Sequence, residues 1–135
     1  LILILVFPCA AQKLKTEEVP ATIVQASVNR IPDSAQVQWI KRDSLYLAQF
    51  KHKGISACAT FNTGAEWLNT QWELPLEYLP KKISSYLAEH YPAYKISQCL
   101  IEYKGGGEYY LVGLKKKKDR PMLRFNIKSV FMMKE

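Results

Sequence analysis

Apolar residues recur at every fourth position in two stretches of the chain. These positions are Val19, Ile23, Ser27 and Ile31 in the first stretch and Leu79, Ile83, Leu87 and Tyr91 in the second. A spacing of four predicts an α-helix with one apolar face. Pro20 and Pro80 suit a first helical turn, where a backbone N–H has no partner to lose. Pro32 and Pro92 end the helices, because the residue before a proline disfavours helical geometry.

Short segments of alternating or continuous apolar character follow each predicted helix. They are 36–41, 45–52, 55–62 and 66–73 after the first helix, and 96–103, 108–115, 121–126 and 129–134 after the second. Turn residues such as Asp43-Ser44, Lys53-Gly54 and Asn62-Thr63-Gly64 separate the first group. Because the connections are short, we expect antiparallel strands.

Several pairs of residues recur at a nearly constant distance. Val19-Pro20 returns 60 residues later as Leu79-Pro80, and Phe61-Asn62 returns 64 residues later as Phe125-Asn126. The longer offset is explained by a longer hairpin at Gly105–Gly107. The sequence therefore predicts an α+β fold made of a tandem repeat, each repeat a helix followed by a four-stranded antiparallel β-meander. The predicted repeats are 12–75 and 76–135, packed as one compact unit.

The predicted strands place apolar residues on both faces of the sheet. Tyr46, Ala48 and Phe50 share one face, which we assign to the side beneath the helix. Leu45, Leu47, Tyr109 and Leu111 project from the opposite face, where a solvated sheet would carry polar residues. We expect this second face to contact a protein or peptide partner.

The tryptophans extend this expectation. Trp67 and Trp72 are an odd number of residues apart, so a regular strand directs them to opposite faces. One of the two is expected to lie outside the core and to join the contact surface, because large rings favour partner contacts. The predicted partner-binding residues are Leu45, Leu47, Trp67, Trp72, Tyr109 and Leu111.

The motifs together resemble a known family. They are Val19-Pro20, Val37-Gln38-Trp39, Tyr46-Leu47-Ala48-Gln49-Phe50 and Phe61-Asn62-Thr63-Gly64-Ala65-Glu66-Trp67. This pattern resembles the PepSY-like, β-lactamase-inhibitor-like proteins secreted by Bacteroidetes-type bacteria. The resemblance covers about residues 17–135 and implies an exported fold of tandem helix-plus-sheet units. It implies no activity, because a shared shape does not carry a shared function.

The second half departs from the pattern of this family. Lys128 stands at the position that matches Gly64, and Phe131 stands at the position that matches Trp67. The last turn is therefore expected to differ between the two halves.

The first eleven residues, LILILVFPCAA, form an apolar run that is too short to span a bilayer as a helix. The run is typical of the apolar region of a secretory signal, and we expect cleavage before Gln12. Acylation of Cys9 as a lipoprotein is the alternative, although Phe7 and Pro8 fit a lipobox poorly. The chain is thus expected in the periplasm or the medium, with a membrane as partner only if Cys9 is lipidated.

Charge and cysteines change this picture little. The net charge of +7 comes partly from Lys115–Lys118, and no recognition helix or RNA-binding motif accompanies it. We therefore expect a solvated basic surface and no nucleic-acid partner. Once Cys9 is set aside, Cys58 and Cys99 remain, and we expect two buried free thiols, a disulfide being the alternative.

Candidate chemistry is sparse. His52 and His90 lie in no metal-ligand spacing, and the chain has no nucleophile elbow, phosphate loop or zinc-protease motif. We expect no metal, no cofactor and no enzymatic activity. The predicted function is an exported, non-enzymatic binding module with an inhibitor-like contact to a protein or peptide. The alternatives are a small-molecule carrier with a cavity between helix and sheet, and a purely structural envelope protein.

Overall fold

A computed structural model describes residues 11–135 of the chain. The predicted signal segment and the predicted lipidation at Cys9 lie outside these residues. The chain divides into two compact units, the first ending at Trp72 and the second running from Glu73 to Glu135. Each unit is described separately below. No helix within residues 11–135 is both long enough and apolar enough to cross a bilayer.

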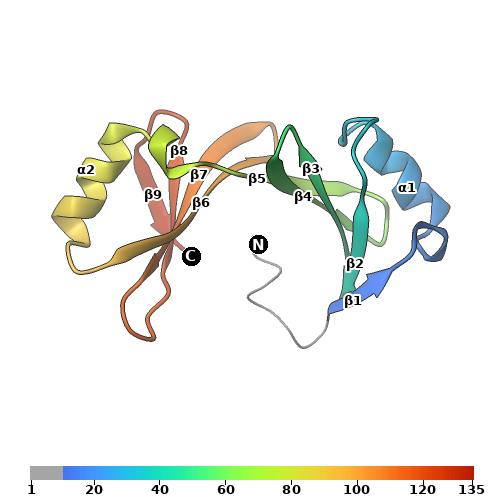
Figure 1. The fold of residues 1–135 in the computed structure, drawn as a ribbon, viewed down its shortest axis with the longest axis horizontal. Helices are drawn as coiled ribbons and strands as arrows, with labels where there is room; N and C mark the ends of the chain where they lie inside the picture. The colour runs from blue at the N-terminus through green and yellow to red at the C-terminus, as the bar shows by residue number, and fades with distance from the viewer. Residues whose placement is uncertain (1–10) are drawn as a thin grey trace. The chain divides into compact units, whose positions relative to one another are not determined.

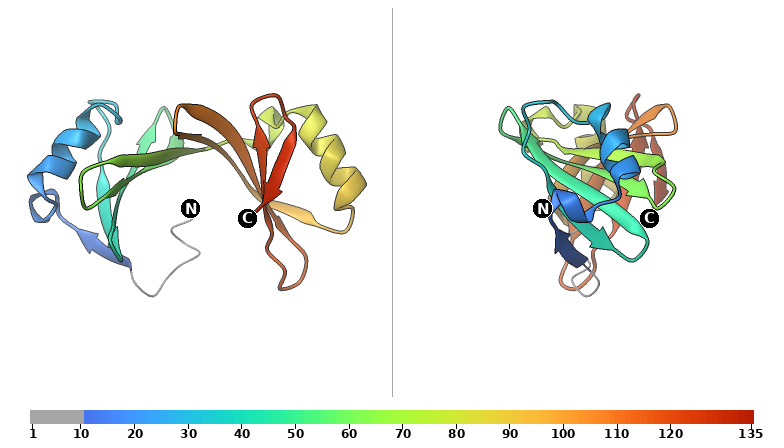
Figure 2. Two further views of the ribbon diagram at one scale, coloured as in Figure 1. Left: turned by 180° about the vertical axis from the view of Figure 1, so that it is seen from behind. Right: turned by 90° about the vertical axis from the view of Figure 1, so that its right-hand side faces the viewer.

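The described part of unit 1 contains one α-helix and five strands (Figure 1). In chain order its elements are β1 (Ala11–Leu14), the 3-10 turn η2 (Thr16–Glu18), α1 (Ala21–Val28), β2 (Gln38–Arg42), β3 (Leu45–His52), β4 (Ile55–Asn62) and β5 (Trp67–Glu73). Each strand from β1 to β5 pairs antiparallel with the next. The helix α1 lies against one face of this sheet in both views of Figure 2.

Unit 2 contains the second helix and four strands (Figure 1). Its elements are the 3-10 turn η3 (Leu76–Tyr78), α2 (Lys81–His90), β6 (Lys95–Lys104), β7 (Gly107–Lys115), β8 (Met122–Asn126) and β9 (Phe131–Lys134). The strands β6 to β9 again form an antiparallel meander. The connection between β6 and β7 turns at Gly105 and Gly106, which both have positive φ, so the glycines serve a hairpin tip.

The predicted fold class is wrong. The nine strands belong to one sheet in the order β1 to β9, so the fold is not a tandem repeat of helix and four-stranded meander. The prediction also missed β1, which precedes α1 and pairs with β2 through Leu14 and Trp39. The matches between the two halves of the sequence give the order of the elements along the chain. They do not show whether the strands of the two halves form one sheet or two. A strand edge carries unpaired N–H and C=O groups, and these favour continuation of a sheet over an abrupt end.

The helices begin where the prolines predict. Pro20 and Pro80 precede α1 and α2, and the carbonyl of each accepts hydrogen bonds from the N–H groups three and four residues later. The helix α1 ends at Val28 and α2 at His90, both before the second proline of each pair. The prolines therefore fix the start of each helix, while each end falls inside the limit that Pro32 and Pro92 set.

Each helix covers a hydrophobic core. In unit 1 Ile23 is completely buried against Ala48, Ala59 and Phe61. In unit 2 Ile83 and Leu87 pack with Val112, Leu123 and Phe125. The small alanines of β3 and β4 leave room for α1 to approach its sheet closely. The side of the sheet beneath the helix is therefore the one that the alternation predicts.

The turns after β4 and β8 are alike, contrary to expectation. The side chain of Asn62 accepts hydrogen bonds from the N–H groups of Gly64 and Glu66, and Asn126 accepts the same pair from Lys128 and Val130. The left-handed residue of each turn is Ala65 (φ 63°) in the first and Ser129 (φ 66°) in the second. Lys128 therefore does not alter the turn, because the left-handed position is one residue further along.

Candidate binding surface

The side of the unit 2 sheet that faces away from α2 is called the second face here. Strand pairing places its residues in two rows that run across the sheet. One row is Leu100, Leu111, Arg124 and Met133, and the other is Glu102, Tyr109, Asn126 and Val130. In each row the first residue lies on β6 and the last lies on β9 or in the turn that leads into it.

Exposure increases across the second face toward β9. Leu100 and Leu111 each expose 1% of their surface, and Glu102 exposes 2%. Met133 and Val130, at the other end of the rows, expose 50% and 45%. The second face of unit 2 thus has a buried base and an exposed apolar margin along β9.

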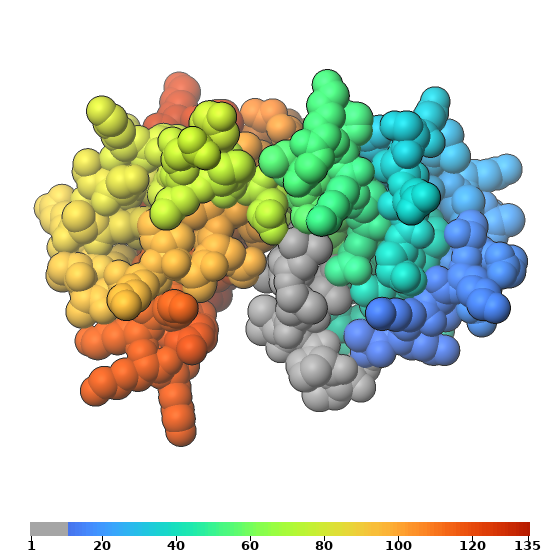
Figure 3. All heavy atoms as spheres, in the orientation of Figure 1, coloured from blue at the N-terminus to red at the C-terminus, as the bar shows by residue number. Residues whose placement is uncertain are grey.

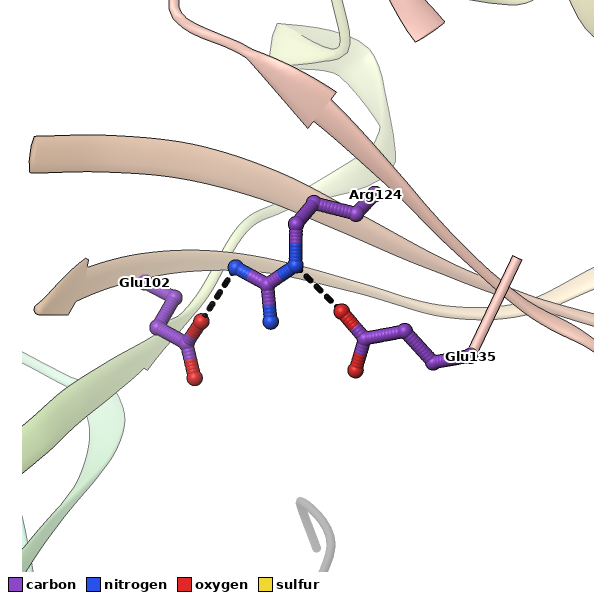
Figure 4. A network of polar contacts seen from close by, with 3 residues as sticks. All are labelled: Glu102, Arg124 and Glu135. Atoms are coloured by element: carbon purple, nitrogen blue, oxygen red, sulfur yellow. Dashed lines mark hydrogen bonds and ion pairs between the residues drawn. The ribbon is translucent and has the colours of Figure 1, made fainter. Parts of the chain in front are cut away.

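An ion-pair network holds this buried base together (Figure 4). Nη1 of Arg124 donates to Oε1 of Glu102 at 2.6 Å, and Nε of Arg124 donates to Oε2 of Glu135. The guanidinium also lies 5.0 Å from the centre of the Tyr109 ring. Burial opposes the charge on Arg124, but hydrogen bonds to the two carboxylates outweigh this effect, so the pKa of Arg124 is raised. The arginine therefore stays charged and fixes the position of Tyr109.

Two of the predicted partner-binding residues are not accessible. Leu47 exposes 3% of its surface and Leu111 exposes 1%, so neither offers a free contact. Leu45 and Tyr109 are half-buried. Alternation along a strand gives the side to which a residue points, but it does not say whether that side is covered, and this is why the prediction failed for the two leucines.

The prediction that one tryptophan lies outside the core is also wrong. Trp67 and Trp72 are both half-buried and both pack against the core beneath α1. A register shift between Thr60 and Phe61 places Trp67 opposite Phe61 and Asn69 opposite Thr60, so Leu68 is an extra residue in β5. This β-bulge cancels the odd separation and brings both rings to one side.

Each tryptophan has specific partners within unit 1. Nε1 of Trp67 donates a hydrogen bond to Oγ1 of Thr70 at 2.8 Å, and the guanidinium of Arg30 lies 3.7 Å from the Trp67 ring centre. Trp72 meets Phe50 edge-on at 5.4 Å. The two rings therefore serve packing in this structure more than contact with a partner.

The sequence prediction missed Val130 and Met133. The predicted strand 129–134 contains β9, but nothing in its pattern identifies it as the last strand of the sheet. The one sequence feature that indicates a contact surface here is the adjacent pair Met132-Met133 beside Lys134. Methionine is enriched at protein interfaces because its flexible thioether adapts to different partners.

A separate cleft of about 560 Å³ lies in unit 1, at the beginning of β2. Its lining combines the apolar Ala35, Val37 and Phe50 with six polar residues: Ser34, Gln36, Gln38, Gln49, Lys51 and Ser56. None of its lining residues belongs to α1, so the cleft is not the cavity between helix and sheet that the carrier alternative requires.

The two cysteines of residues 11–135 are buried and have raised pKa values. Cys58 and Cys99 are both free and buried, as predicted, and burial raises the pKa of Cys58 to about 12 and that of Cys99 to about 11. Thiols with raised pKa are weak nucleophiles, because the thiolate is the reactive form. No group of three or more histidines, cysteines or carboxylates among the described residues is placed to hold a metal ion.

Comparison with protein-family models gives no match, and comparison with curated proteins gives none either. Solved structures do match. A DUF2874 family protein from Bacteroides uniformis aligns with a TM-score of 0.73 and 17% identity, over 87% of this chain and 88% of that one. A BLIP-like protein from Bacteroides fragilis aligns with a TM-score of 0.71 and 20% identity, over 85% and 84%. This chain has their fold.

A third structure adds a cellular location for a relative. It comes from Bacteroides eggerthii, is named among "putative periplasmic proteins", and aligns with a TM-score of 0.73 and 16% identity over 87% of this chain and 88% of that one. At such identities the likeness concerns the fold alone. It supports the β-lactamase-inhibitor-like part of the resemblance at that level, and no comparison shows the PepSY-like part.

Proposed function

We propose that this chain is a periplasmic or secreted, non-enzymatic binding module that docks an extended segment of a partner protein or peptide along β9. The observation that carries the proposal is the exposed apolar margin of the second face, where Val130 and Met133 lie half exposed beside the half-buried Tyr109. The signal-like first residues and the periplasmic name of the Bacteroides eggerthii relative support export. In the inhibitor-like version, the docked segment belongs to an envelope or secreted enzyme.

The backbone of β9 suits the addition of a strand. This strand is the last in the order of the sheet, and no other strand of residues 11–135 pairs with its outer side. The N–H of Glu135 donates inward to the carbonyl of Met122 at 2.7 Å. Because neighbouring residues of a strand point their backbone groups to opposite sides, the N–H of Lys134 points outward. An extended peptide can pair with that free group.

The two edges of the sheet differ in their side chains. The other edge strand, β1, has the sequence Ala-Gln-Lys-Leu and is mostly exposed and polar. The strand β9 has the sequence Phe-Met-Met-Lys, with Met132 and Met133 about half exposed. Charged and polar edges discourage strand addition, whereas apolar edges favour it. The side-chain chemistry therefore favours β9 as the docking edge.

The chemistry around β9 also indicates the character of the partner. Met133 and Val130 offer apolar contacts, and Arg124 holds Tyr109 in place behind them. Lys128 and Lys134 flank this margin, and the chain as a whole carries a net charge of +7. Opposite charges steer association and favour the correct partner. The partner segment is therefore expected to alternate apolar and acidic residues.

The test selects ten-residue peptides from a random library, about the length that pairs with one strand. Selection uses the full chain, and the selected peptides are then measured by fluorescence anisotropy. The proposal expects enrichment of alternating apolar and acidic residues. It also expects the double variant Val130→Asp, Met133→Glu to bind these peptides at least about tenfold more weakly, because it places like charge and unpaired polar groups in the contact.

Val28→Glu is the matched control, since Val28 is 60% exposed on α1 and the change adds a charge to an apolar surface residue of unit 1. It should leave peptide affinity unchanged. Selection of unrelated sequences, or equal loss of affinity in the control and the β9 variant, contradicts the proposal. Peptide affinity is the quantity compared throughout, because the proposal concerns binding only.

A further inference from the structure

Six of the nineteen lysines and arginines of the chain gather at one end of unit 2. The basic cluster is defined as Lys95, Lys115, Lys116, Lys117, Lys118 and Arg120, which are all exposed. Lys95 begins β6, and the other five lie at the end of β7 and in the hairpin that leads to β8. Six cations less the one carboxylate of Asp119 leave +5 of the net +7.

The cluster contains contacts that folding alone does not favour. Lys95 and Lys115 are direct cross-strand partners, and like charges that face each other across a ladder are destabilising. Lys117 adopts a left-handed backbone with φ 55°, a conformation in which glycine or asparagine is usual. Departures from local preference concentrate at functional positions.

The single acidic residue of the hairpin does not neutralise the lysines. Oδ2 of Asp119 accepts a hydrogen bond of 2.5 Å from the hydroxyl of Tyr94. Nη1 of Arg120 donates to the carbonyls of Lys117 and Asp119, so the arginine is held against the hairpin backbone. No carboxylate among residues 11–135 forms an ion pair with a lysine of the cluster. Four consecutive lysines therefore keep their charges free on a braced hairpin.

The hairpin projects beyond the rest of unit 2. Figure 1 shows its loop, coloured orange-red, extending past the ends of the neighbouring strands, and Figure 3 shows long side chains extending from the same segment. The backbone of the tip is closed by reciprocal hydrogen bonds between Lys116 and Asp119, at 3.1 and 2.9 Å. The tip is therefore both projecting and held in shape.

We propose that the basic cluster is a contact site for the phosphate headgroups of an anionic lipid surface. Lysine acts as a compact point charge that needs no fixed partner geometry, which suits mobile headgroups. Single-stranded nucleic acid is less suited, because it needs aromatic rings on which bases stack. The ring of Tyr94 lies beside the tip and is already engaged: the ammonium of Lys116 lies 5.5 Å from its centre, and its hydroxyl donates to Asp119.

The test is co-sedimentation of the purified full chain with lipid vesicles. Wild-type protein should bind vesicles that contain phosphatidylglycerol, should not bind vesicles of pure phosphatidylcholine, and should bind less as salt is raised. The variant Lys116→Glu, Lys118→Glu should bind at least about tenfold more weakly, because each lysine near an anionic surface contributes separately. The neutral variant Lys116→Gln, Lys118→Gln should give an intermediate loss of vesicle binding. It replaces the charge-reversal variant in the test if that variant does not fold.

The matched control is Lys51→Glu, Lys53→Glu, which changes the net charge equally at two exposed lysines of unit 1. It should retain most vesicle binding. Three results overturn the proposal: no binding to phosphatidylglycerol vesicles, an equal loss in the control, and tighter binding to single-stranded polynucleotide or sulfated polysaccharide than to vesicles. Because these vesicles carry no peptide, the result is independent of whether β9 docks a strand.

Discussion

Arg124 and Glu102 form an ion pair between β8 and β6, with 2.6 Å between Nη1 and Oε1 and with both side chains buried. The pair spans β7 on the second face and supports the margin where Val130 and Met133 are exposed. A buried charge without a partner of opposite charge is destabilising, and Arg124 and Glu102 supply that partner to each other. The candidate surface therefore rests on a rigid polar base.

Removal of one partner should be strongly destabilising. Glu102→Ala is expected to lower the free energy of unfolding by about 3 kcal/mol, because it leaves Arg124 buried with one carboxylate fewer. The exposed Glu108→Ala on the neighbouring strand should change it by less than about 0.5 kcal/mol. Denaturant unfolding measures both. Equal effects in the two variants would contradict the role assigned to the pair.

A double variant separates the charge from the packing. Glu102→Leu together with Arg124→Met should cost less than the two single changes added together, since apolar residues of similar size leave no charge unpaired. The same denaturant titration gives the coupling energy. Simple additivity would mean that the two residues act independently.

The turns after β4 and β8 should be improved by glycine. Ala65 and Ser129 adopt positive φ, a region that disfavours residues with a Cβ atom. Ala65→Gly and Ser129→Gly are each expected to raise the free energy of unfolding by about 0.5–1 kcal/mol. Gly54→Ala is the reverse change at a residue with φ 80°. It should lower the free energy of unfolding. A loss of stability in both glycine variants would show that the backbone there is not strained.

Stability should fall at alkaline pH because of the buried thiols. Burial raises the pKa of Cys58 to about 12, from its ordinary value of 9.0. A raised pKa in the folded state means that the contribution of the thiol is complete below pH 9.0 and is lost as pH rises toward 12. Between pH 8 and pH 10 the wild type should lose about 1 kcal/mol more than Cys58→Ala.

Ser56→Ala is the control for the pH experiment, because it changes a buried residue of the same strand without removing a titrating thiol. Its stability should follow the same pH dependence as the wild type. Chemical denaturation at each pH gives the values. If Cys58→Ala also follows the wild-type curve, the thiol is not responsible for the alkaline loss.

The sequence predicted the local elements better than their assembly. Prolines at positions 20 and 80 fixed the start of each helix, because proline geometry acts on adjacent residues. The continuous order of nine strands was not predictable, since it includes successive strands that a helix separates along the chain, and the pattern of a strand does not show whether pairing resumes after a helix. The expected repeat failed for this reason.

The candidate site was predictable only in part. Alternation placed Leu111 and Tyr109 on a common face, but it gave no information on exposure, and Leu111 is buried. The bulge at Leu68 reversed the expectation for Trp67 and Trp72, because a single extra residue changes the side to which a ring points. The exposure of Val130 and Met133 depends on the place of β9 at the edge of the sheet, which the sequence pattern does not give.

The most direct test of the proposed docking edge is amide hydrogen exchange at Lys134, measured by NMR with and without a peptide selected on the full chain. The N–H of Lys134 points away from β8, whereas the N–H of Glu135 already donates to Met122. The account predicts that the peptide slows exchange at Lys134 and changes Glu135 far less. Unchanged exchange at Lys134 in a saturated complex would contradict strand docking at β9.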